Sequence, residues 1–465
     1  MTRPSLAIVG GGLSGAALAW QILRTAARPL DMRIIERQEA LGAGVAYRTS
    51  HPGHRLNVRT RAMSLDPDAP DHLLEWLGAE GREAVRTWGA SPDPDGFLPR
   101  GLYREYVEYA IQSATREAKS GVVLERVRGR AVDLKHDRRG TAVRLEDGGT
   151  IRTGPVVLAV GNPAPAHPTA EDLPFYASPR YIRDPWSDES IATIRPEDHV
   201  LLLGSNLTMV DLAVSLASRT HRGPITAVSR HGLISATHGP AAPPAPPFEP
   251  DSRPSRLREL VRAMRERVRE GAARGVDWRA VVDGFRPEVS GAWRTLSAED
   301  RRRFVSHVRP FWEIHRHRAP AEVMAGVDAL RASGRLTLRA GHIRRIEESD
   351  QRVAVTLVPR GNGGVERLAV DRVVNATGPE ADYRRVEDPL LSQLFRAGMI
   401  RPGPLGMGLD AEEDGALVDA EGRRSPFLST LGPTLRGVLW ETTAAPEIRG
   451  QARELAGRLL REVHG

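Results

Sequence analysis

LAIVGGGLSGAA, residues 6–17, is the stretch that decides the fold of this chain. A run of four apolar residues, too short for a helix, leads into glycines spaced Gly10-x-Gly12-x-x-Gly15, and good helix formers follow. This order predicts a strand, a tight turn and a helix. Glycines at this spacing make the turn, let a pyrophosphate approach the backbone and let the helix pack on the strand. Free N–H groups at the helix start, at Leu13 and Ser14, would hold the phosphates.

A second predicted strand, MRIIE at residues 32–36, ends in an acid about 20 residues beyond the glycines. A carboxylate in this position accepts hydrogen bonds from the ribose 2′-hydroxyl of a dinucleotide. Glycines alone end many strands, so the acid supplies the context that the glycine motif lacks. We therefore expect a dinucleotide site rather than a plain structural turn. Its residues would be Gly10, Gly12, Leu13, Ser14, Gly15, Glu36 and Arg37.

The composition narrows the classes of function. The chain has 465 residues, of which 40% are hydrophobic, so it can bury a large core spread over two or three domains. It has no cysteine, which excludes disulfides, thiolate nucleophiles and the dithiol chemistry of many flavoprotein reductases. The formal charge is +7, but basic residues alternate with acids, as in RERVRE at residues 265–270, so we expect no nucleic-acid or membrane partner. The first strand lies too early for a signal peptide and no apolar run could span a bilayer, so we expect a cytoplasmic protein.

The second half of the chain repeats the order of elements found in the first half. In the first half, a strand and a small antiparallel meander over residues 122–152 follow the second strand, and a closing strand ends at Gly161. In the second half, a strand, turn and helix at residues 199–211 precede a strand at 225–230, a meander at 336–358 with a turn at 361–364, and a closing strand that ends at Gly378. We therefore expect an α/β protein with two Rossmann-like domains, each carrying an antiparallel β-meander.

The two units differ where their ligands would differ. The first unit ends its second strand in Glu36, which suits a free ribose hydroxyl, whereas the second ends in Ser229 and Arg230, which suit a 2′-phosphate. This difference predicts FAD in the first unit and NADPH in the second. Asn206 stands where the second glycine of the later turn belongs, and its Cβ would crowd a pyrophosphate, although asparagine tolerates a left-handed backbone. An exposed strand end is the alternative for Ser229 and Arg230.

An insertion separates the second strand and the meander of the second unit. A proline-rich linker at residues 239–247 leads into predicted helices at 255–271, 277–284 and 298–308. The insertion ends in aromatic, histidine and arginine residues, which would contact an anion or carboxylate or simply cap and pack the helix. His315 and His317 are two apart and point to different faces of a helix, so we expect no metal site.

The tail of the chain returns to the first unit. Residues 430–433 and 437–449 predict a strand and a loop, followed by a helix from about 446 to 462. The N-terminus of this helix would stabilise a reduced flavin through its dipole, and an ordinary surface helix is the alternative. The predicted domains are an FAD-binding domain at residues 1–190 and 379–465, and an NAD(P)H-binding domain at 191–378 with a helical insertion at about 250–335.

Motifs over nearly the whole chain resemble those of two-dinucleotide-binding-domain flavoproteins. Within that group the chain is similar to a bacterial FAD/NAD(P)-binding family related to N-hydroxylating, class B-type flavin monooxygenases, one branch of which resembles L-aspartate N-monooxygenases. The motifs are Gly10-x-Gly12-x-x-Gly15, Gly44-x-x-Tyr47, His54-x-Leu56-Asn57-Val58, Met63-Ser64, Phe97-x-Pro99-Arg100-x-x-Tyr103, Leu158-Ala159-x-Gly161-Asn162, Gly204-x-x-Leu207-Thr208-x-x-Asp211, Ser229-Arg230-x-Gly232, Arg316-His317-Arg318, Ala376-Thr377-Gly378-Pro379 and Trp440-Glu441-Thr442.

The resemblance implies a monooxygenase that uses FAD, NADPH, dioxygen and a small-molecule amine or amino acid, with an aspartate-like compound as a candidate substrate. NADPH would reduce the flavin, which would form a C4a-hydroperoxide and transfer one oxygen to nitrogen. An NAD(P)H oxidoreductase without oxygen insertion and a noncatalytic flavin-binding protein are the alternatives. The resemblance adds Asn57, Val58, Met63, Gly161, Gly204, Asn206, Thr208, Gly378, Trp440 and Thr442 to the cofactor contacts, and gives Asn57, Arg100, His315 and Arg318 as candidate catalytic or substrate contacts.

Overall fold

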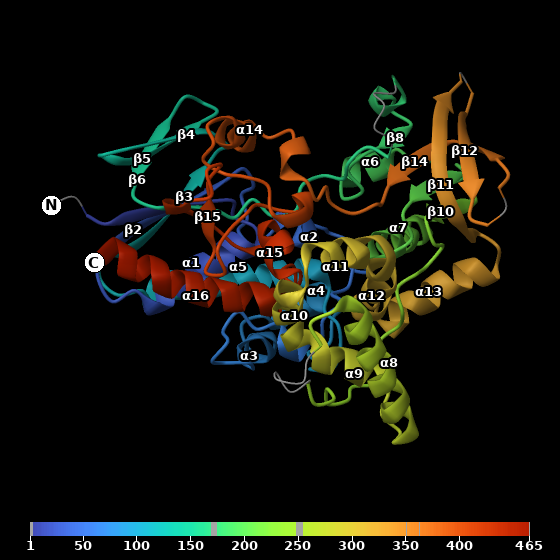
Figure 1. The fold of residues 1–465 in the computed structure, drawn as a ribbon, viewed down its shortest axis with the longest axis horizontal. Coiled ribbons are helices and arrows are strands. Elements are labelled where there is room, and N and C mark those ends of the chain that lie inside the picture. Colours follow the sequence, from blue (N-terminus) through green and yellow to red (C-terminus); the bar gives the residue numbers. More distant parts are fainter. Residues whose placement is uncertain (1–2, 169–173, 248–253, 350, 362, 465) are drawn as a thin grey trace.

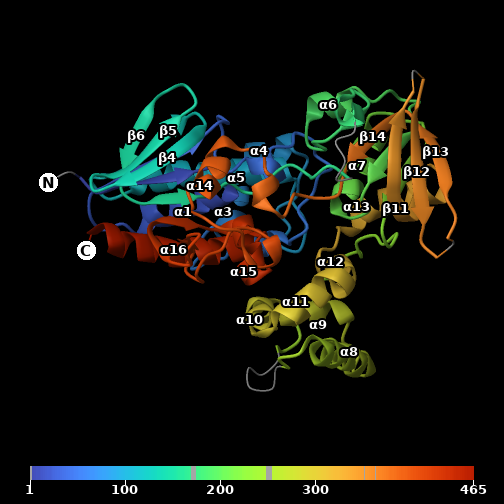
Figure 2. The same cartoon turned by 45° about the horizontal axis from the view of Figure 1, so that its top comes forward.

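The computed structural model describes residues 3–168, 174–247, 254–349, 351–361 and 363–464. These residues form two α/β units side by side and a helical lobe that extends away from both (Figure 1 and Figure 2). The predicted domain ends at residues 1 and 465, the predicted start of the insertion near residue 250, and Asn362 of the predicted turn lie outside the described residues.

The first unit contains the elements β1 (Ser5–Val9), α1 (Leu13–Thr25), β2 (Leu30–Glu36), α2 (Gly44–Tyr47), α3 (His72–Gly78), α4 (Arg82–Thr87), α5 (Arg100–Glu117), β3 (Val122–Arg128), β4 (Ala131–Asp137), β5 (Gly140–Leu145), β6 (Thr150–Thr153), β7 (Val156–Leu158), α14 (Pro389–Arg396), β15 (Ala416–Val418), β16 (Arg424–Thr430), α15 (Arg436–Leu439) and α16 (Ala445–His464). Its six-stranded sheet has the order β15-β16-β7-β1-β2-β3, parallel except at β15.

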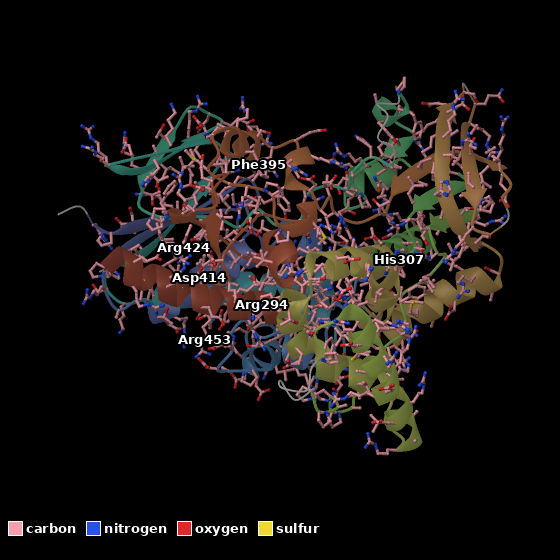
Figure 3. All side chains as sticks on the ribbon, viewed as in Figure 1. Arg294, His307, Phe395, Asp414, Arg424 and Arg453 are labelled. Atoms are coloured by element: carbon pink, nitrogen blue, oxygen red, sulfur yellow. The ribbon has the colours of Figure 1, made fainter. Side chains whose placement is uncertain are left out.

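Side chains alternate across the first sheet and build a core on each face. Leu6 and Ile8 of β1 pack with α1, α5 and α16, whereas Ala7 and Val9 pack with the separate β4-β5-β6 sheet and α14. The prediction of a strand followed by a small meander is thus confirmed, because β3 joins the main sheet and β4 to β6 form their own. At the edge of the sheet, Arg424 donates to Asp414 at 2.6 Å, which ties β16 to the turn before β15 (Figure 3).

The second unit contains β8 (Tyr181–Ile182), α6 (Asp188–Ala192), β9 (Val200–Leu203), α7 (Leu207–Ser218), β10 (Ile225–Ser229), α13 (Ala321–Ala332), β11 (Leu336–Glu348), β12 (Val353–Pro359), β13 (Glu366–Val370) and β14 (Arg372–Asn375). Its sheet has the order β13-β12-β11-β10-β9-β14-β8. Here the meander is not separate, because β11 is long enough to pair with β10 and then with β12. The chain enters this sheet at β8, ahead of residue 190, and α13 packs on α7 in this unit's core.

The helical lobe consists of α8 (Leu257–Ala273), α9 (Trp278–Phe285), α10 (Val289–Thr295), α11 (Ala298–Arg303) and α12 (Arg309–Arg316). The predicted helices correspond to α8, α9 and α11, whereas α10 and α12 lie outside the predicted ranges. No helix in the described ranges is both long and apolar enough to cross a membrane.

The tail differs from its prediction in one respect. The predicted strand at residues 430–433 is wrong beyond Thr430, where β16 ends. Gly432 has a φ of 79° and Pro433 lacks an N–H donor, so the ladder stops and two short helical segments follow. The predicted helix from about 446 to 462 is confirmed as α16.

Candidate functional site

The first glycines of the two strand-to-helix turns have the same backbone geometry. The φ angle is 105° at Gly10 and 112° at Gly204. A Cβ on Gly10 would lie 2.3 Å from the carbonyl oxygen of Ala159, and a Cβ on Gly204 would lie 2.3 Å from that of Ala376. Only glycine fits at either position, so the repeat seen in the sequence is also a repeat of structure.

The turns differ at the next two glycine positions of the motif. A Cβ on Gly15 would lie 2.0 Å from a carbonyl oxygen of its own turn, whereas buried Met209 fills the matching place in the second unit. Gly12 and Asn206 are both N-caps with ordinary backbone, with φ angles of −64° and −100°. Asn206 therefore needs no left-handed conformation, and its side-chain oxygen accepts a hydrogen bond from the Ser235 hydroxyl.

The acid at the end of β2 sits directly against the first turn. Glu36 accepts hydrogen bonds from the backbone N–H of Gly11 at 2.6 Å and from that of Gln38 at 2.9 Å. Its carboxylate is therefore held beside the start of α1, where a ribose hydroxyl would meet it.

Cations gather at the end of β10 in the second unit. The Ser229 hydroxyl accepts hydrogen bonds from the Ser205 hydroxyl at 2.7 Å and from the N–H of Gly232 at 3.0 Å. Exposed Arg230 adjoins His231, whose ring accepts a hydrogen bond from Arg360. Burial, with Arg360 and Arg230, lowers the pKa of His231. Two guanidinium groups at a strand end suit a phosphate.

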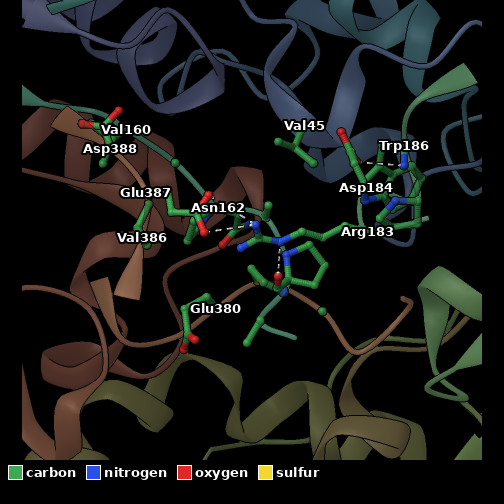
Figure 4. Close-up of a pocket in the computed structure, with 18 of the residues that line it drawn as sticks. Val45, Val160, Asn162, Arg183, Asp184, Trp186, Glu380, Val386, Glu387 and Asp388 are labelled. Atoms are coloured by element: carbon green, nitrogen blue, oxygen red, sulfur yellow. Dashed lines mark hydrogen bonds and ion pairs between the residues drawn. The ribbon is translucent and has the colours of Figure 1, made fainter. Parts of the chain in front are cut away.

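A cleft of about 850 Å³ lies between the units and takes lining residues from both. The predicted site residues Arg37, Gly161, Thr208, Gly378 and Arg100 all line it. A Cβ on either Gly161 or Gly378 would meet no atom within 4 Å, so these glycines face open space with φ angles of 68° and 86°. Figure 4 shows Arg183 across this cleft; its Nε donates to the Pro165 carbonyl at 3.0 Å and its Nη1 lies 3.5 Å from Glu387.

A buried ion pair joins the units beside the cleft. Arg100 at the start of α5 places its Nη2 2.8 Å from Oδ2 of Asp211 on α7. Burial raises the pKa of Asp211 to about 6, although the Arg100 guanidinium lowers it. Arg100 is a candidate substrate contact, but its guanidinium already forms this ion pair between the two units. The sequence did not assign Asp211 a role, although an acid between Val210 and Leu212 on a buried helix face was a usable signal.

His54 extends this contact. Its ring nitrogens lie 2.7 Å from the Thr49 hydroxyl and 2.6 Å from the Ser215 hydroxyl of α7. Burial and the nearby Arg100 lower the pKa of His54 to about 3, which keeps the imidazole neutral.

The loop that holds Asn57, Val58 and Met63 meets the second unit. The Asn57 carbonyl accepts a hydrogen bond from His238 Nε2 at 3.1 Å. Val58 packs on the core of the first unit, and Met63, only 1% exposed, lies within it. The structure thus brings Asn57 to the contact between the units but buries Met63 below it.

Trp440 has a strained backbone immediately before Glu441. Its φ and ψ angles are 63° and −65°, and the N–H of Glu441 donates to the Leu439 carbonyl at 2.8 Å, which makes a rare γ-turn. The Trp440 ring lies 4.9 Å from that of Trp293. Thr442, fully buried, donates to the Gly432 carbonyl at 2.6 Å and so fixes the approach to α16.

A buried network of charges links the end of α12 to the start of α16. Arg316 lies 3.2 Å from Glu441 and 3.7 Å from Glu447, and Glu447 also pairs with Arg286 at 2.5 Å. Sequence reasoning assigned no role to Arg286, which is distant in the chain from Glu447 and carries no spacing signal.

Arg318 and His315, two candidate substrate contacts from the sequence, lie in different surroundings: the first is buried and the second is exposed. Arg318 is buried and pairs with Asp283 through Nη2, but its Nε and Nη1 have no acceptor among the described residues. A buried donor without a partner costs about 1–3 kcal/mol, so these atoms are suited to an added acceptor. His315 is exposed, with Nδ1 2.7 Å from the Phe311 carbonyl. In the described part of the chain, no three histidine, cysteine or acidic residues gather to hold a metal.

Comparison with known sequences adds a family match for part of the chain. Residues 7–163 match the model of a family described as FAD-NAD(P)-binding. An alignment of 244 positions that covers 47% of this chain is 28% identical to the nitrosuccinic acid synthase npaA of Aspergillus oryzae. The matched stretch covers 36% of that relative, so the chain spans only about a third of its length.

The solved structures that resemble this chain align with nearly its whole length. The reduced ornithine hydroxylase PvdA from Pseudomonas aeruginosa has a TM-score of 0.65 at 15% identity, covering 99% of this chain and 100% of that one. L-Lysine 6-monooxygenase from Pseudomonas syringae has a TM-score of 0.64 at 18% identity, with the same coverage. The resemblance to two-dinucleotide-binding-domain flavoproteins is therefore confirmed for the fold.

Proposed function

We propose that this chain is an FAD- and NADPH-dependent monooxygenase that hydroxylates the nitrogen of a small amine or amino acid. The observation that carries the proposal is that the two units repeat one glycine turn, backed by Glu36 in the first and followed by Arg230 in the second, and that one cleft takes lining residues from both units. Arg37 and Thr208, which follow these features in the two units, line that cleft together. A pair of dinucleotide sites that face each other suits hydride transfer between two cofactors.

The residues present fit FAD in the first unit, proposed as residues 1–190 and 379–465. Gly10, Gly12 and Gly15 keep Cβ atoms away from the turn, and the Glu36 carboxylate is already held beside it. Gly161 and Gly378 leave open space at the ends of β7 and β14. Bound FAD would supply two-electron redox chemistry and the reaction with dioxygen. The proposed contacts are Gly10, Gly12, Leu13, Ser14, Gly15, Glu36, Arg37, Asn57, Val58, Met63, Gly161, Gly378, Trp440 and Thr442.

The second unit, proposed as residues 191–378, would hold NADPH. Gly204, Asn206 and Thr208 form its turn, and Asn206 stands in ordinary backbone with its side chain bonded to Ser235. Ser229 and Arg230 would contact the 2′-phosphate. This arrangement disfavours a noncatalytic protein in which Asn206 has spoiled the second site.

An acidic amino acid, such as aspartate, is the proposed substrate. The name of the npaA relative refers to nitrosuccinic acid, which is a dicarboxylic acid. Arg318 offers two buried guanidinium nitrogens without acceptors, and Arg316 offers a third. Carboxylates bind guanidinium groups through paired, charge-assisted hydrogen bonds, so these arginines would orient the substrate amine.

The test is made on the purified protein with its bound flavin. NADPH is added without oxygen and flavin absorbance is followed; air is then admitted with L-aspartate, L-ornithine, L-lysine or no substrate. We expect rapid flavin reduction, and hydroxylamine or further oxidised nitrogen products with L-aspartate. Reduction without any oxygenated product would favour an NAD(P)H oxidoreductase, and a flavin that NADPH never reduces would overturn both enzyme functions.

A further inference from the structure

A second cavity, of about 740 Å³, lies in the helical lobe. It shares no lining residue with the cleft between the units. Aliphatic side chains of α8, among them Leu260, Val261 and Met264, form one wall. The opposite walls carry the aromatic rings of Trp278, Trp293, Trp312 and Trp440. Small-molecule sites typically measure about 300–1,000 Å³ and have mostly apolar walls, so this cavity has the dimensions of a ligand site.

The titratable side chains that line this cavity are all basic. Its titratable lining residues are Arg265, Arg269, His307 and His315, and among the described residues no acid lines it. Arg265 and Arg269 are exposed, lie one helical turn apart on α8, and form no ion pair with any described residue. His307, labelled in Figure 3, lies between α11 and α12.

Two acids lie near these arginines. Glu266 and Asp300 line a neighbouring groove that also takes Arg265 and Arg269 into its lining, but neither acid forms an ion pair with these two arginines. Asp300 accepts a hydrogen bond from the backbone N–H of Leu257 at 3.1 Å and so caps the start of α8. Arg265 and Arg269 at the mouth of the apolar cavity therefore have no ion-pair partner in the described chain, which leaves both guanidinium groups able to bind an added carboxylate.

We propose that this cavity binds an apolar anion, namely an aliphatic or aromatic carboxylate. Its hydrocarbon body would lie against the tryptophans and the apolar face of α8, where burial from water favours it. Its carboxylate would lie at the mouth, between Arg265 and Arg269. Trp440, a proposed FAD contact, also lines this cavity, but none of the described residues lines both the cavity and the cleft between the units, so binding of the anion can be tested whatever reaction the chain performs.

The test titrates the full-length protein with dodecanoate and with dodecylamine, followed by tryptophan fluorescence and calorimetry. We expect saturable binding of dodecanoate with one site per chain, and binding of dodecylamine weaker by about tenfold or more because like charges meet at the mouth. The double variant Arg265→Glu/Arg269→Glu should reverse this preference. Val261→Trp should narrow the cavity and weaken both ligands, with circular dichroism confirming the fold.

The matched control is Arg256→Glu/Arg274→Glu, which makes the same change of charge at the two ends of α8, where neither residue lines a cavity. It should leave the preference for dodecanoate unchanged. An absence of saturable binding, equal affinity for both ligands, or an equal effect of the control would overturn the proposal. So would a dimer in sedimentation experiments that Val261→Trp dissociates, because a second copy of the chain would then cover the cavity.

Discussion

The two units share the first glycine of their turns but differ in how closely the following helix approaches. In the first unit α1 lies so near its turn that a Cβ on Gly15 would strike a carbonyl oxygen at 2.0 Å, whereas the second unit accommodates a whole methionine, Met209, there. The backbone path that the two units share therefore requires glycine only at Gly10 and Gly204, and the path of the first unit also requires it at Gly15. The other two glycines are required only where helix, strand and ligand approach closely, which fits a tightly held FAD in the first unit and an exchanging NADPH in the second.

The largest effect should come from the same substitution in the two turns. Gly10→Ala and Gly204→Ala each place a Cβ 2.3 Å from a carbonyl oxygen, at a φ that alanine rarely adopts, and should cost about 3 kcal/mol or more locally. We expect Gly10→Ala to purify without flavin. Gly204→Ala should remain yellow but lose reduction by NADPH, measured anaerobically. If both variants lost flavin equally, the assignment of one cofactor to each unit would be wrong.

The contact between the units provides the next test. Arg100→Leu leaves the buried Asp211 carboxylate without its partner and should destabilise the protein by about 3–5 kcal/mol near neutral pH. The double variant Arg100→Leu/Asp211→Leu removes both charges and should recover most of that loss in thermal or urea unfolding. A double variant as unstable as the single one would mean that Arg100 acts through its contact with the Trp186 ring, 5.4 Å away, rather than through Asp211.

The pH dependence of the same pair has a defined sign. Burial raises the pKa of Asp211 to about 6 from 3.8, so between these values the folded protein retains a proton that the unfolded chain has released. The contribution of Asp211 to stability is therefore fully present below about pH 4 and falls by up to about 3 kcal/mol as the pH rises to 7. Comparing wild type with Asp211→Asn across this range by urea unfolding isolates the contribution. A difference that does not change with pH would show that Arg100 holds Asp211 ionised throughout.

The sequence predicts the parts of this fold that depend on local spacing. The glycine turn at Gly10, the copy at Gly204 and the α16 helix follow from period and turn chemistry, which act over a few residues. The Arg100 contact with Asp211 and the Arg286 contact with Glu447 do not, because the partners are 111 and 161 residues apart and meet only through packing. The γ-turn at Trp440 could not be predicted from the sequence either, because tryptophan has no preference for positive φ.

Removing Arg230 at the end of β10 should have a smaller effect, and one that is selective for NADPH over NADH. Arg230→Ala should raise the KM for NADPH by about tenfold to a hundredfold, since a charge-assisted contact is worth about 1.5–3 kcal/mol, and should leave the KM for NADH nearly unchanged. Initial rates of flavin reduction with each nucleotide measure this. Arg222→Ala, which removes an exposed arginine paired with Glu197 elsewhere in the unit, is the control. Equal effects on both nucleotides would remove the assignment of the 2′-phosphate to Arg230.

The smallest effect is expected where the two turns look most different in sequence. Asn206→Gly restores the second glycine, yet Asn206 already has a φ of −100°, so no strain is relieved, and its hydrogen bond from Ser235 is lost. We expect stability to fall by about 1 kcal/mol or less and the KM for NADPH to change by about twofold at most. Thermal unfolding and flavin reduction kinetics measure the two effects. If the variant instead bound NADPH much more tightly, the asparagine Cβ would indeed crowd the pyrophosphate, and the missing glycine would be the feature that keeps the second nucleotide exchangeable.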